Sequence, residues 1–210
     1  MRSFLAFAFL IPLTAALPVQ GAQAQGPQGI TSDRIEDAAA TPQDAERPLD
    51  RAARLDKLFA DLKRERNPRG AERIANFIRE EWSRSGSASI DLMMQWSSKA
   101  MEDKKFDVAL DFLDQVTMLA PDYAEGWNRR ATVHYMMNSY AKSMADIEHT
   151  LRLEPRHFGA LSGMAEIFKL YGRKQAALDA YGRVLAVYPM LRNAQEQVST
   201  LADELAGEGI

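Results

Sequence analysis

The sequence predicts an all-helical fold, an α-solenoid of stacked antiparallel helix pairs, and three observations support this prediction. Pro121, Pro155 and Pro189 are spaced 34 residues apart. Units that place each proline at position 32 share columns of small and of large apolar residues. The chain on both sides of these units holds apolar stripes at helical spacing. A period of this length is typical of helix–turn–helix repeats, whose core is the layer between neighbouring units.

Three units, 90–123, 124–157 and 158–191, share five further columns. Small residues allow two helix axes to approach closely, and large apolar residues fill the layers between them. The small residues are Ser97, Ala131 and Ala165 at position 8, and Ala109, Ser143 and Ala177 at position 20. The large ones are Met93, Trp127 and Leu161 at position 4, Leu113, Ile147 and Tyr181 at position 24, and Leu119, Leu153 and Val187 at position 30.

These columns resemble the tetratricopeptide repeat (TPR) family over residues 90–191. The middle unit carries the resemblance best, with Trp127, Ala131, Tyr140, Ile147 and Pro155. Its stretches 120–132 and 153–161 are similar to small secreted proteobacterial TPR proteins of the cell envelope. The resemblance implies a right-handed superhelix and a protein-binding role. Three residues depart from the family pattern: Arg130 at position 7, Ser143 at position 20 and Lys174 at position 17.

The flanks of the repeats are predicted to be helical as well. Residues 49–89 hold two apolar stripes separated by Asn67-Pro68, which predicts a degenerate first helix pair. Residues 192–210 hold one apolar stripe and are expected to form a capping helix over the last unit. The expected total is therefore eight repeat helices plus the cap. At the start of the middle unit, Asp122 and Glu125 are expected to form a capping box.

The first 24 residues are predicted to be an export signal. Arg2 precedes the 16-residue apolar stretch Phe4–Val19, and small residues predict cleavage after Ala24. The stretch is shorter than the about 20 residues of a membrane span, although an uncleaved anchor is the alternative. Residues 25–48 are expected to be a disordered linker, or a segment that docks on the solenoid. The protein is then expected in the periplasm, without a stable membrane span after cleavage.

Composition excludes several kinds of chemistry. Removing residues 1–24 removes only Arg2 among the charged residues and takes the net charge from −3 to −4, so nucleic acid is not an expected partner. The chain contains no cysteine, and His134, His149 and His157 lack the spacing of metal ligands. His134 is expected in the core, and the other two histidines at the surface or in turns. We expect no enzyme activity, no catalytic residue, no cofactor and no metal.

The first helix of each unit is expected to line a concave groove. Its positions 2, 5, 9 and 12 form one stripe, flanked by positions 6 and 13. The candidate binding residues on this stripe are Met94, Gln95, Ser98, Met101, Asn128, Arg129, Thr132, Tyr135, Met136, Glu166 and Lys169. Gly159 and Gly163 are expected to leave part of the groove open. The two-carboxylate clamp of the family is not matched as a set, since only Asn128 stands at one of its places.

The sequence therefore predicts a periplasmic scaffold that binds another secreted or envelope protein through this groove. The alternative is a binder of cell-wall glycan or another small ligand. Sugar rings need aromatic stacking partners, and Tyr135 is the sole aromatic residue on the predicted stripe, which favours the protein partner. The sequence does not identify the partner and leaves self-association open.

Overall fold

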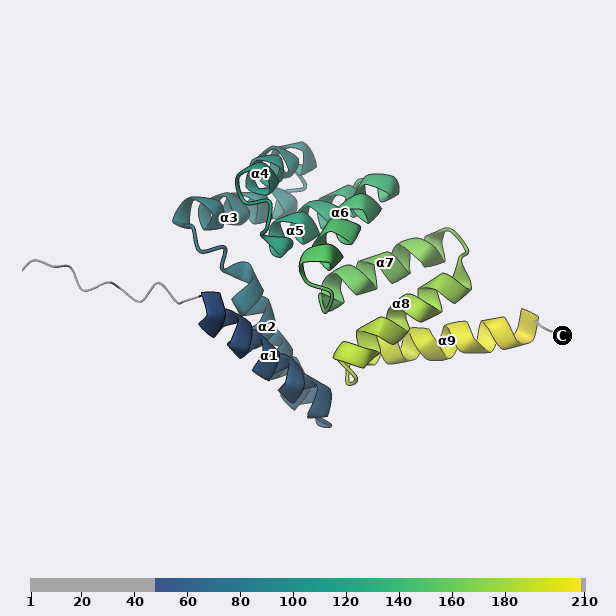
Figure 1. The fold of residues 1–210 in the computed structure, drawn as a ribbon. Helices are drawn as coiled ribbons and strands as arrows, with labels where there is room; N and C mark the ends of the chain where they lie inside the picture. The colour runs from purple at the N-terminus through teal and green to yellow at the C-terminus, as the bar shows by residue number, and fades with distance from the viewer. Residues whose placement is uncertain (1–47, 209–210) are drawn as a thin grey trace, which may run out of the picture. The chain divides into compact units, whose positions relative to one another are not determined.

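The computed structural model describes residues 48–208. The predicted signal (1–24) and all of the predicted linker except Pro48 lie outside the described residues. The described residues form nine α-helices and no β-strand (Figure 1), so the predicted all-helical architecture is confirmed. The helices are α1 (Pro48–Arg64), α2 (Pro68–Ser83), α3 (Ala88–Glu102), α4 (Phe106–Leu119), α5 (Ala124–Met136), α6 (Tyr140–Leu153), α7 (Phe158–Leu170), α8 (Lys174–Val187) and α9 (Arg192–Glu208).

The 34-residue period is visible in the backbone of α3 to α8. Each pair turns through one residue with positive φ, namely Lys104 (58°), Asn138 (57°) and Gly172 (66°). All three stand at position 15 of their units. The next residue in each turn donates its N–H to a carbonyl five residues back at 2.8 Å. Lysine rarely adopts this left-handed conformation, so the repeat imposes the turn on the residue rather than the reverse.

Three of the five predicted columns are buried throughout the stack, whereas position 4 is buried at Met93 and Leu161 but only partly at Trp127. The residues at positions 8, 20 and 24 are all buried. At position 30, by contrast, Leu119 is 62% exposed and Leu153 is 36% exposed. Position 27 fills the layer instead, where Val116, Thr150 and Val184 are fully buried. Position 27 shares a helix face with positions 20 and 24, whereas position 30 is turned roughly 120° away from position 24.

The last helix, α9, packs against α8 and covers the final repeat. Its apolar stripe supplies the buried residues Ala194 and Leu201, with Val198 partly buried beside them. Its other residues are mostly exposed and polar. This arrangement is that of a terminal cap, which buries one face against the stack and keeps the other in water.

Helices α1 and α2 form a hairpin. Arg51 donates from Nη2 to the carbonyl of Glu81 at 2.6 Å, and Arg54 pairs with the same glutamate at 3.5 Å. The break predicted at Asn67-Pro68 separates the two helices. There the Asn67 side chain accepts hydrogen bonds from the N–H groups of Arg69 and Gly70 at the start of α2.

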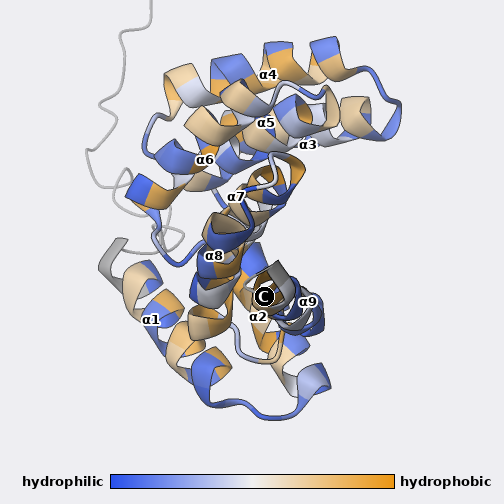
Figure 2. Ribbon diagram, turned by 90° about the vertical axis from the view of Figure 1, so that its right-hand side faces the viewer, coloured by the Kyte–Doolittle hydropathy of each residue, from blue (hydrophilic) through white to orange (hydrophobic). Residues whose placement is uncertain are grey.

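The α1–α2 hairpin does not extend the stack of repeats. A first helix pair would be expected to stack on the next pair, α3 and α4. Its closest packing outside itself is with α8 and α5 rather than with α3 and α4. Figure 2 shows it near α8 and α9, with α3 and α4 at the opposite end. The stripe predicted from the sequence is buried, but its partners are residues of α7, α8 and α9. The hairpin residues of this core are Leu55, Phe59, Leu62, Ala71, Ala75, Ile78 and Trp82.

Specific contacts hold the hairpin in this position. The Trp82 ring stacks on the His157 ring with centroids 4.1 Å apart, and lies 4.9 Å from the Phe158 ring. The Tyr123 hydroxyl donates to the carbonyl of Ser83 at 2.8 Å. Stacked aromatic rings contribute about 0.5–1.5 kcal/mol beyond the area that they bury. The end of α2 is therefore fixed to the turns that precede α5 and α7.

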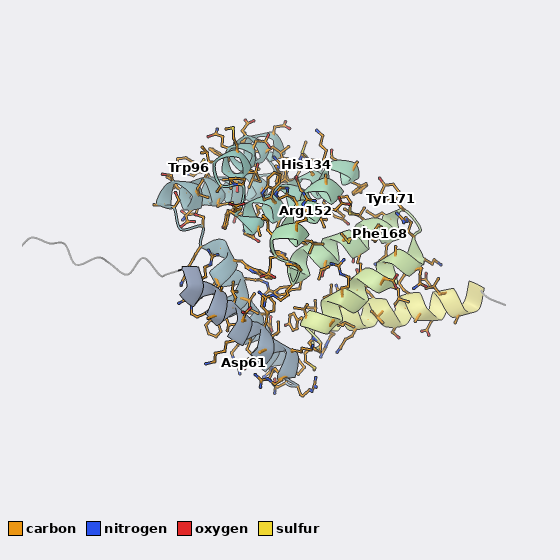
Figure 3. The ribbon with its side chains drawn as sticks, viewed as in Figure 1. Asp61, Trp96, His134, Arg152, Phe168 and Tyr171 are labelled. Atoms are coloured by element: carbon orange, nitrogen blue, oxygen red, sulfur yellow. The ribbon has the colours of Figure 1, made fainter. Side chains whose placement is uncertain are left out.

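The outer edge of the first repeat is left without a covering helix pair. Trp96 on α3 and Val108 on α4 are 47% and 42% exposed. The Trp96 ring lies 5.4 Å from that of Phe112, beside a shallow surface depression of about 350 Å³. Figure 3 shows Trp96 at the end of the stack remote from α9. Within the described residues, no helix combines the length and apolar character needed to span a membrane.

Candidate functional site

A pocket of about 170 Å³ opens between α5 and α7, where the concave groove was predicted. Its floor includes Ile147 of α6, and its sides come from the two facing helices. The small residues at positions 8 and 20 allow these helices to approach the floor closely. The lining residues are Asn128, Ala131, Thr132, Tyr135, Ser143, Ile147, Gly159, Ala160, Gly163 and Glu166.

Three polar side chains that line the pocket already donate hydrogen bonds within the chain. The Ser143 hydroxyl donates to the carbonyl of Ala131 at 2.8 Å, and the Thr132 hydroxyl donates to that of Asn128 at 3.0 Å. The Asn128 amide nitrogen donates to Glu125 at 3.0 Å. Since these donors already have acceptors, the pocket presents mainly methyl, methylene and ring surface.

Glu125 is the centre of a polar network at the start of α5. Its carboxylate accepts from Arg129 at 2.9 Å and from the ring of His157 at 3.2 Å. The other ring nitrogen of His157 accepts from the N–H of Ala160, which assigns the proton to Nε2 and makes it the donor to Glu125. Arg129 also donates to the Ser98 hydroxyl at 2.5 Å. The network thus joins α3, α5 and α7.

The ionisation of Glu125 is set by two opposing effects. Burial raises the pKa of a carboxyl group because it disfavours the charged form. The hydrogen bonds from His157 and Arg129, together with the charge of Arg129, outweigh this effect, so the pKa of Glu125 lies below its ordinary value of 4.5. The carboxylate is therefore ionised at neutral pH and fully engaged by groups of the same chain.

A second network closes the other end of the groove. Glu166 accepts a hydrogen bond from the Tyr181 hydroxyl and pairs with Lys169 at 3.3 Å. Lys169 in turn donates to Gln197 of the capping helix. Burial and the neighbouring Glu166 raise the pKa of Tyr181, so its phenol stays protonated and remains a donor. The charges of both networks are therefore balanced inside the chain.

The structure brings four of the predicted site residues into the pocket: Asn128, Thr132, Tyr135 and Glu166. Tyr135 is half-buried and its ring lies edge-on to that of Tyr140, with centroids 5.5 Å apart. Lys169 lies next to the pocket through its pairing with Glu166. Met136, which follows Tyr135, is exposed outside the pocket.

The predicted residues of α3 lie apart from the pocket. Met94 was expected on the groove floor, but it is 6% exposed and belongs to the core between α3 and α4. Met101 is partly buried against the same core, and Gln95 is exposed. Ser98 and Arg129 join the Glu125 network, which makes Arg129 a structural residue as well as a groove residue. Of the three methionines predicted to line the groove, Met94 therefore belongs to the repeat core and Met101 packs against it, whereas Met136 is exposed.

Of two sequence predictions at the turns, one holds in part and the other is wrong. His157 was expected at the surface, or in a turn; it does lie in a turn, but it is 2% exposed and caps α7. The capping box of Asp122 and Glu125 does not form, because Tyr123 precedes α5 and Glu125 binds His157 and Arg129 instead. The floor residues Ala131, Ser143 and Ile147 were missed as site residues, although their columns place them where helices approach.

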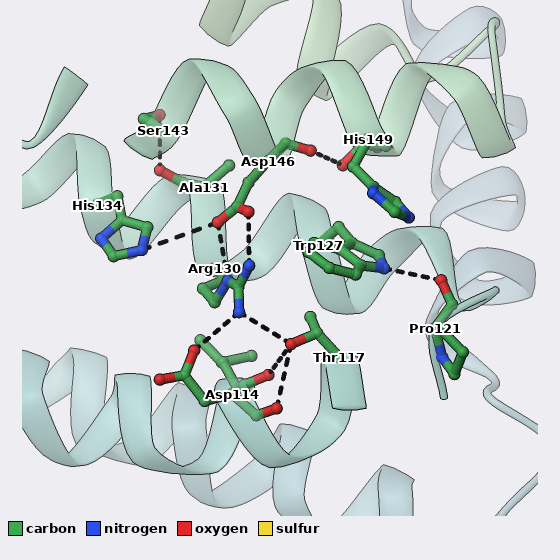
Figure 4. A network of polar contacts seen from close by, with 12 residues as sticks. Asp114, Thr117, Pro121, Trp127, Arg130, Ala131, His134, Ser143, Asp146 and His149 are labelled. Carbon is green, nitrogen blue, oxygen red and sulfur yellow. Dashed lines mark hydrogen bonds and ion pairs between the residues drawn. The ribbon is translucent and has the colours of Figure 1, made fainter. Parts of the chain in front are cut away.

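Arg130 departs from the family pattern, and its charge is balanced by Asp146, which stands at the position that Phe112 holds in the first unit. It forms a bidentate pair with the buried Asp146 at 2.9 and 2.7 Å, and also bonds Asp114 and Thr117 of α4 (Figure 4). The hydrogen bond with Asp146 raises the pKa of Arg130. In the first unit the same two positions hold the apolar pair Trp96 and Phe112. An ion pair therefore replaces an aromatic pair at equivalent places.

His134 lies beside this ion pair, 3.8 Å from Asp146. It is half-buried, as expected for an inward-facing position. Burial lowers its pKa, against the attraction of Asp146, so the ring is neutral at neutral pH. Within residues 48–208, His, Cys, Asp and Glu side chains form no group of three suited to a metal ion.

Comparison with known proteins agrees with this architecture. No model of a known protein family matches the chain. A TPR repeat-containing protein of Rhizobium etli is 60% identical over 154 residues, which cover 73% of this chain and 76% of that protein. This identity, together with the 34-residue helix pairs, shows that the chain belongs to the TPR repeat family.

Solved structures share the fold at low sequence identity. The first TPR domain of Spaghetti (RPAP3), solved with an HSP90 peptide of sequence SRMEEVD, has a TM-score of 0.53 at 19% identity. The match covers 56% of this chain and 93% of that domain. The Sgt2 TPR domain from Aspergillus fumigatus has a TM-score of 0.54 at 17% identity, over 59% of this chain and 83% of that domain. These matches confirm the TPR solenoid fold.

Proposed function

We propose that this protein is a scaffold that binds a segment of another protein in the groove between α5 and α7. The observation that carries the proposal is the open pocket on the inner helices, which is lined by residues of three helices and which no side chain of residues 48–208 fills. Concave solenoid faces serve as ligand surfaces because adjacent helices present side chains at fixed spacing. The fold neighbour Spaghetti, solved with an HSP90 peptide, supports peptide binding as the kind of function.

The place of action in this proposal is the periplasm, with a partner among secreted or cell-envelope proteins. Its support is the sequence of residues 1–24, with an apolar stretch followed by small residues. The expected mature protein starts near Gln25. Intact-mass measurement of the protein from the periplasmic fraction tests this, and a mass that includes Met1 in the membrane fraction would contradict it.

Site-specific photo-crosslinking in the cells that produce the protein tests the binding proposal. A photoreactive residue replaces Thr132, which is exposed and lines the pocket. The matched control replaces Ala145, which is exposed on α6 outside the pocket. We expect one defined protein adduct from position 132 that is missing from position 145. Equal adducts from both positions, or none from position 132, would refute groove binding.

The glycan alternative predicts a different outcome. The pocket is smaller than the roughly 300–1,000 Å³ typical of small-molecule sites, and Tyr135 is its one aromatic lining residue. Retention of the protein on purified insoluble cell wall, abolished by Tyr135→Ala, would favour that alternative. Under our proposal the protein stays in the supernatant.

A further inference from the structure

Two glycines of α7 leave space in the groove, and this space indicates which kind of partner side chain the groove can accept. Gly159 and Gly163 lie one turn apart, and both line the pocket. Glycine inside a helix is destabilising relative to alanine, because the unfolded chain loses more conformational freedom on folding. This penalty applies to Gly163 in the interior of α7, whereas Gly159 lies in the first turn of that helix. A glycine in a helix interior calls for a reason, such as close packing, a left-handed backbone or a site that must stay open.

Packing and backbone conformation do not require these two glycines. At Gly126 of α5, an added Cβ would stand 2.8 Å from a methyl of Val116, so a side chain does not fit. At Gly159 the nearest atom would be a ring carbon of His157 at 3.4 Å, which is an ordinary contact. At Gly163 it would be the terminal methyl of Ile147 at 3.3 Å, a tight contact that a shift of a few tenths of an ångström would relieve. Both glycines have ordinary helical backbones rather than positive φ.

The space that the glycines leave is uncharged in character. The Ser143, Thr132 and Asn128 donors that line it already have acceptors within the chain. The nearby charges are balanced in pairs, Glu125 with Arg129 and Glu166 with Lys169. A charged group that entered the pocket would lose its hydration without gaining a free counter-charge, which is unfavourable. An apolar group has no such cost and gains from burial.

The size of the pocket matches one side chain. Its volume of about 170 Å³ is close to the roughly 150 Å³ apolar cavity that accepts a benzene molecule in an engineered protein. That volume suits a group of valine or leucine size.

We infer that the groove recognises an uncharged segment of its partner by one aliphatic side chain, of valine or leucine size, that enters the pocket against Gly159 and Gly163. This inference rests on the proposed function and specifies the partner's chemistry. Binding is then driven by apolar burial, and it depends little on salt because unpaired charges do not contribute.

The test uses the protein purified from its producing cells with isotope-labelled amides, titrated with capped heptapeptides. The peptides consist of serine and glycine with one central residue, which is leucine, valine, alanine, aspartate or lysine. The acidic peptide SRMEEVD is the comparison ligand. We expect leucine and valine to bind about tenfold or more tighter than alanine, and the charged peptides to bind more weakly still. The shifted amides should include those of Thr132 and Ala160.

The variants Gly159→Ala and Gly163→Ala test whether the pocket itself is responsible. The matched control is Gly182→Ala in α8, where an added Cβ meets no atom within 4 Å. Gly182→Ala should raise the melting temperature by about 1–4 °C, and Gly159→Ala and Gly163→Ala should raise it by less. Only the two groove variants should weaken leucine binding, by about tenfold. The combination of higher stability with lower affinity separates a binding role from a packing role.

Several results would overturn the inference. These are tighter binding of a charged peptide than of the leucine peptide, undiminished leucine binding in both groove variants, or absence of leucine binding to the wild type. A loss of leucine affinity of more than about tenfold between about 0.05 and 0.5 M salt would also contradict it. If Thr132 crosslinks a protein in cells while the leucine peptide does not bind, the proposed function stands and this inference fails. If no protein crosslinks at Thr132, the proposed function itself fails.

Discussion

The two flanks of the repeats look alike in sequence and behave differently in the structure. Both are amphipathic, and both bury their apolar stripes in one shared core. Helix α9 continues the stack and covers α8, whereas the α1–α2 hairpin lies against α5, α7 and α8 and leaves the first repeat uncovered. A stripe at helical spacing therefore predicts which face of a helix is buried, but not which surface buries it.

The connections explain part of this difference. The links 84–87, 120–123, 154–157 and 188–191 all contain four residues. Among these four described links, only the first contains a residue with positive φ, Gly86 at 84°. Asp91 fixes this link by accepting from the N–H and hydroxyl of Ser85. The chain therefore turns away from the direction of the stack before α3 begins.

The consequence is seen at position 7 of the three repeats. Met164 is partly buried in the layers beside it, and Arg130 bonds α4 and α6. Trp96, at the same position, is half exposed because no helix pair precedes its unit in the stack. The same position can thus be core or surface, depending on whether a neighbour is present.

Among the changes that test this comparison of the two flanks, removal of the capping helix α9 should have the largest effect on stability. Deleting residues 192–210 uncovers the apolar surface of α8 that Ala194 and Leu201 bury. We expect aggregation or a fall in melting temperature of roughly 10 °C or more, measured by circular dichroism and light scattering. Deleting only 206–210 should change little. A monomeric truncated protein with unchanged melting would show that α9 does not act as a cap.

The two tryptophans of the N-terminal part provide a matched pair. Trp82 is 5% exposed and holds the hairpin, while Trp96 is 47% exposed at the open edge. Trp82→Ala should lower the free energy of unfolding by about 3–5 kcal/mol, because it creates a cavity and removes the stack on His157. Trp96→Ala should cost less than about 1 kcal/mol. Denaturant unfolding of both variants measures the difference, and a reversed order would place the hairpin on the first repeat.

The register of the repeats is tested by placing a larger side chain where two helices pack closely. Ala165 is fully buried at position 8, whereas Gln175 is exposed on α8. Ala165→Leu should force the helices of the third unit apart and cost about 1–3 kcal/mol. Gln175→Leu should remain within about 0.5 kcal/mol of the wild type. Equal melting temperatures for the two variants would show that the register is misplaced.

The smallest expected effect concerns pH and the network beside the hairpin. Because the pKa of folded Glu125 lies below 4.5, its ionised form stabilises the fold above that pH. This contribution is lost as the pH falls below about 4.5. Glu125→Gln should cost about 1–2 kcal/mol at neutral pH and show a weaker loss of stability on acidification. Denaturant unfolding at several pH values checks this, and parallel pH curves would argue against a role for Glu125.

Much of the fold could be predicted from the sequence, and less of the site. Local spacing predicted all nine helices of the described residues, and over α3 to α8 the period also fixes the turns and the small residues at close approaches. The hairpin's position could not be found this way, since it depends on contacts between residues far apart, such as Trp82 with His157. Met94 was misplaced because positions 4 and 5 both face inward where α3 meets α4. His157 does lie in a turn as predicted, but its burial could not be foreseen, because α2 covers that turn from elsewhere in the chain.

The position of the hairpin is tested most directly by cysteine crosslinking, since the chain has no cysteine of its own. Asp56 of α1 and Arg156 of the α6–α7 turn form an ion pair at 2.7 Å. Cysteines at these two positions should be joined within one chain by a short bismaleimide, as seen by mass spectrometry of the digest. The comparison pair places cysteines at Phe77 of α2 and Trp96 of α3, both exposed. Our account predicts efficient linkage of the first pair and little of the second. Linkage of Phe77→Cys with Trp96→Cys, and none between the first pair, would show that the hairpin stacks on the first repeat.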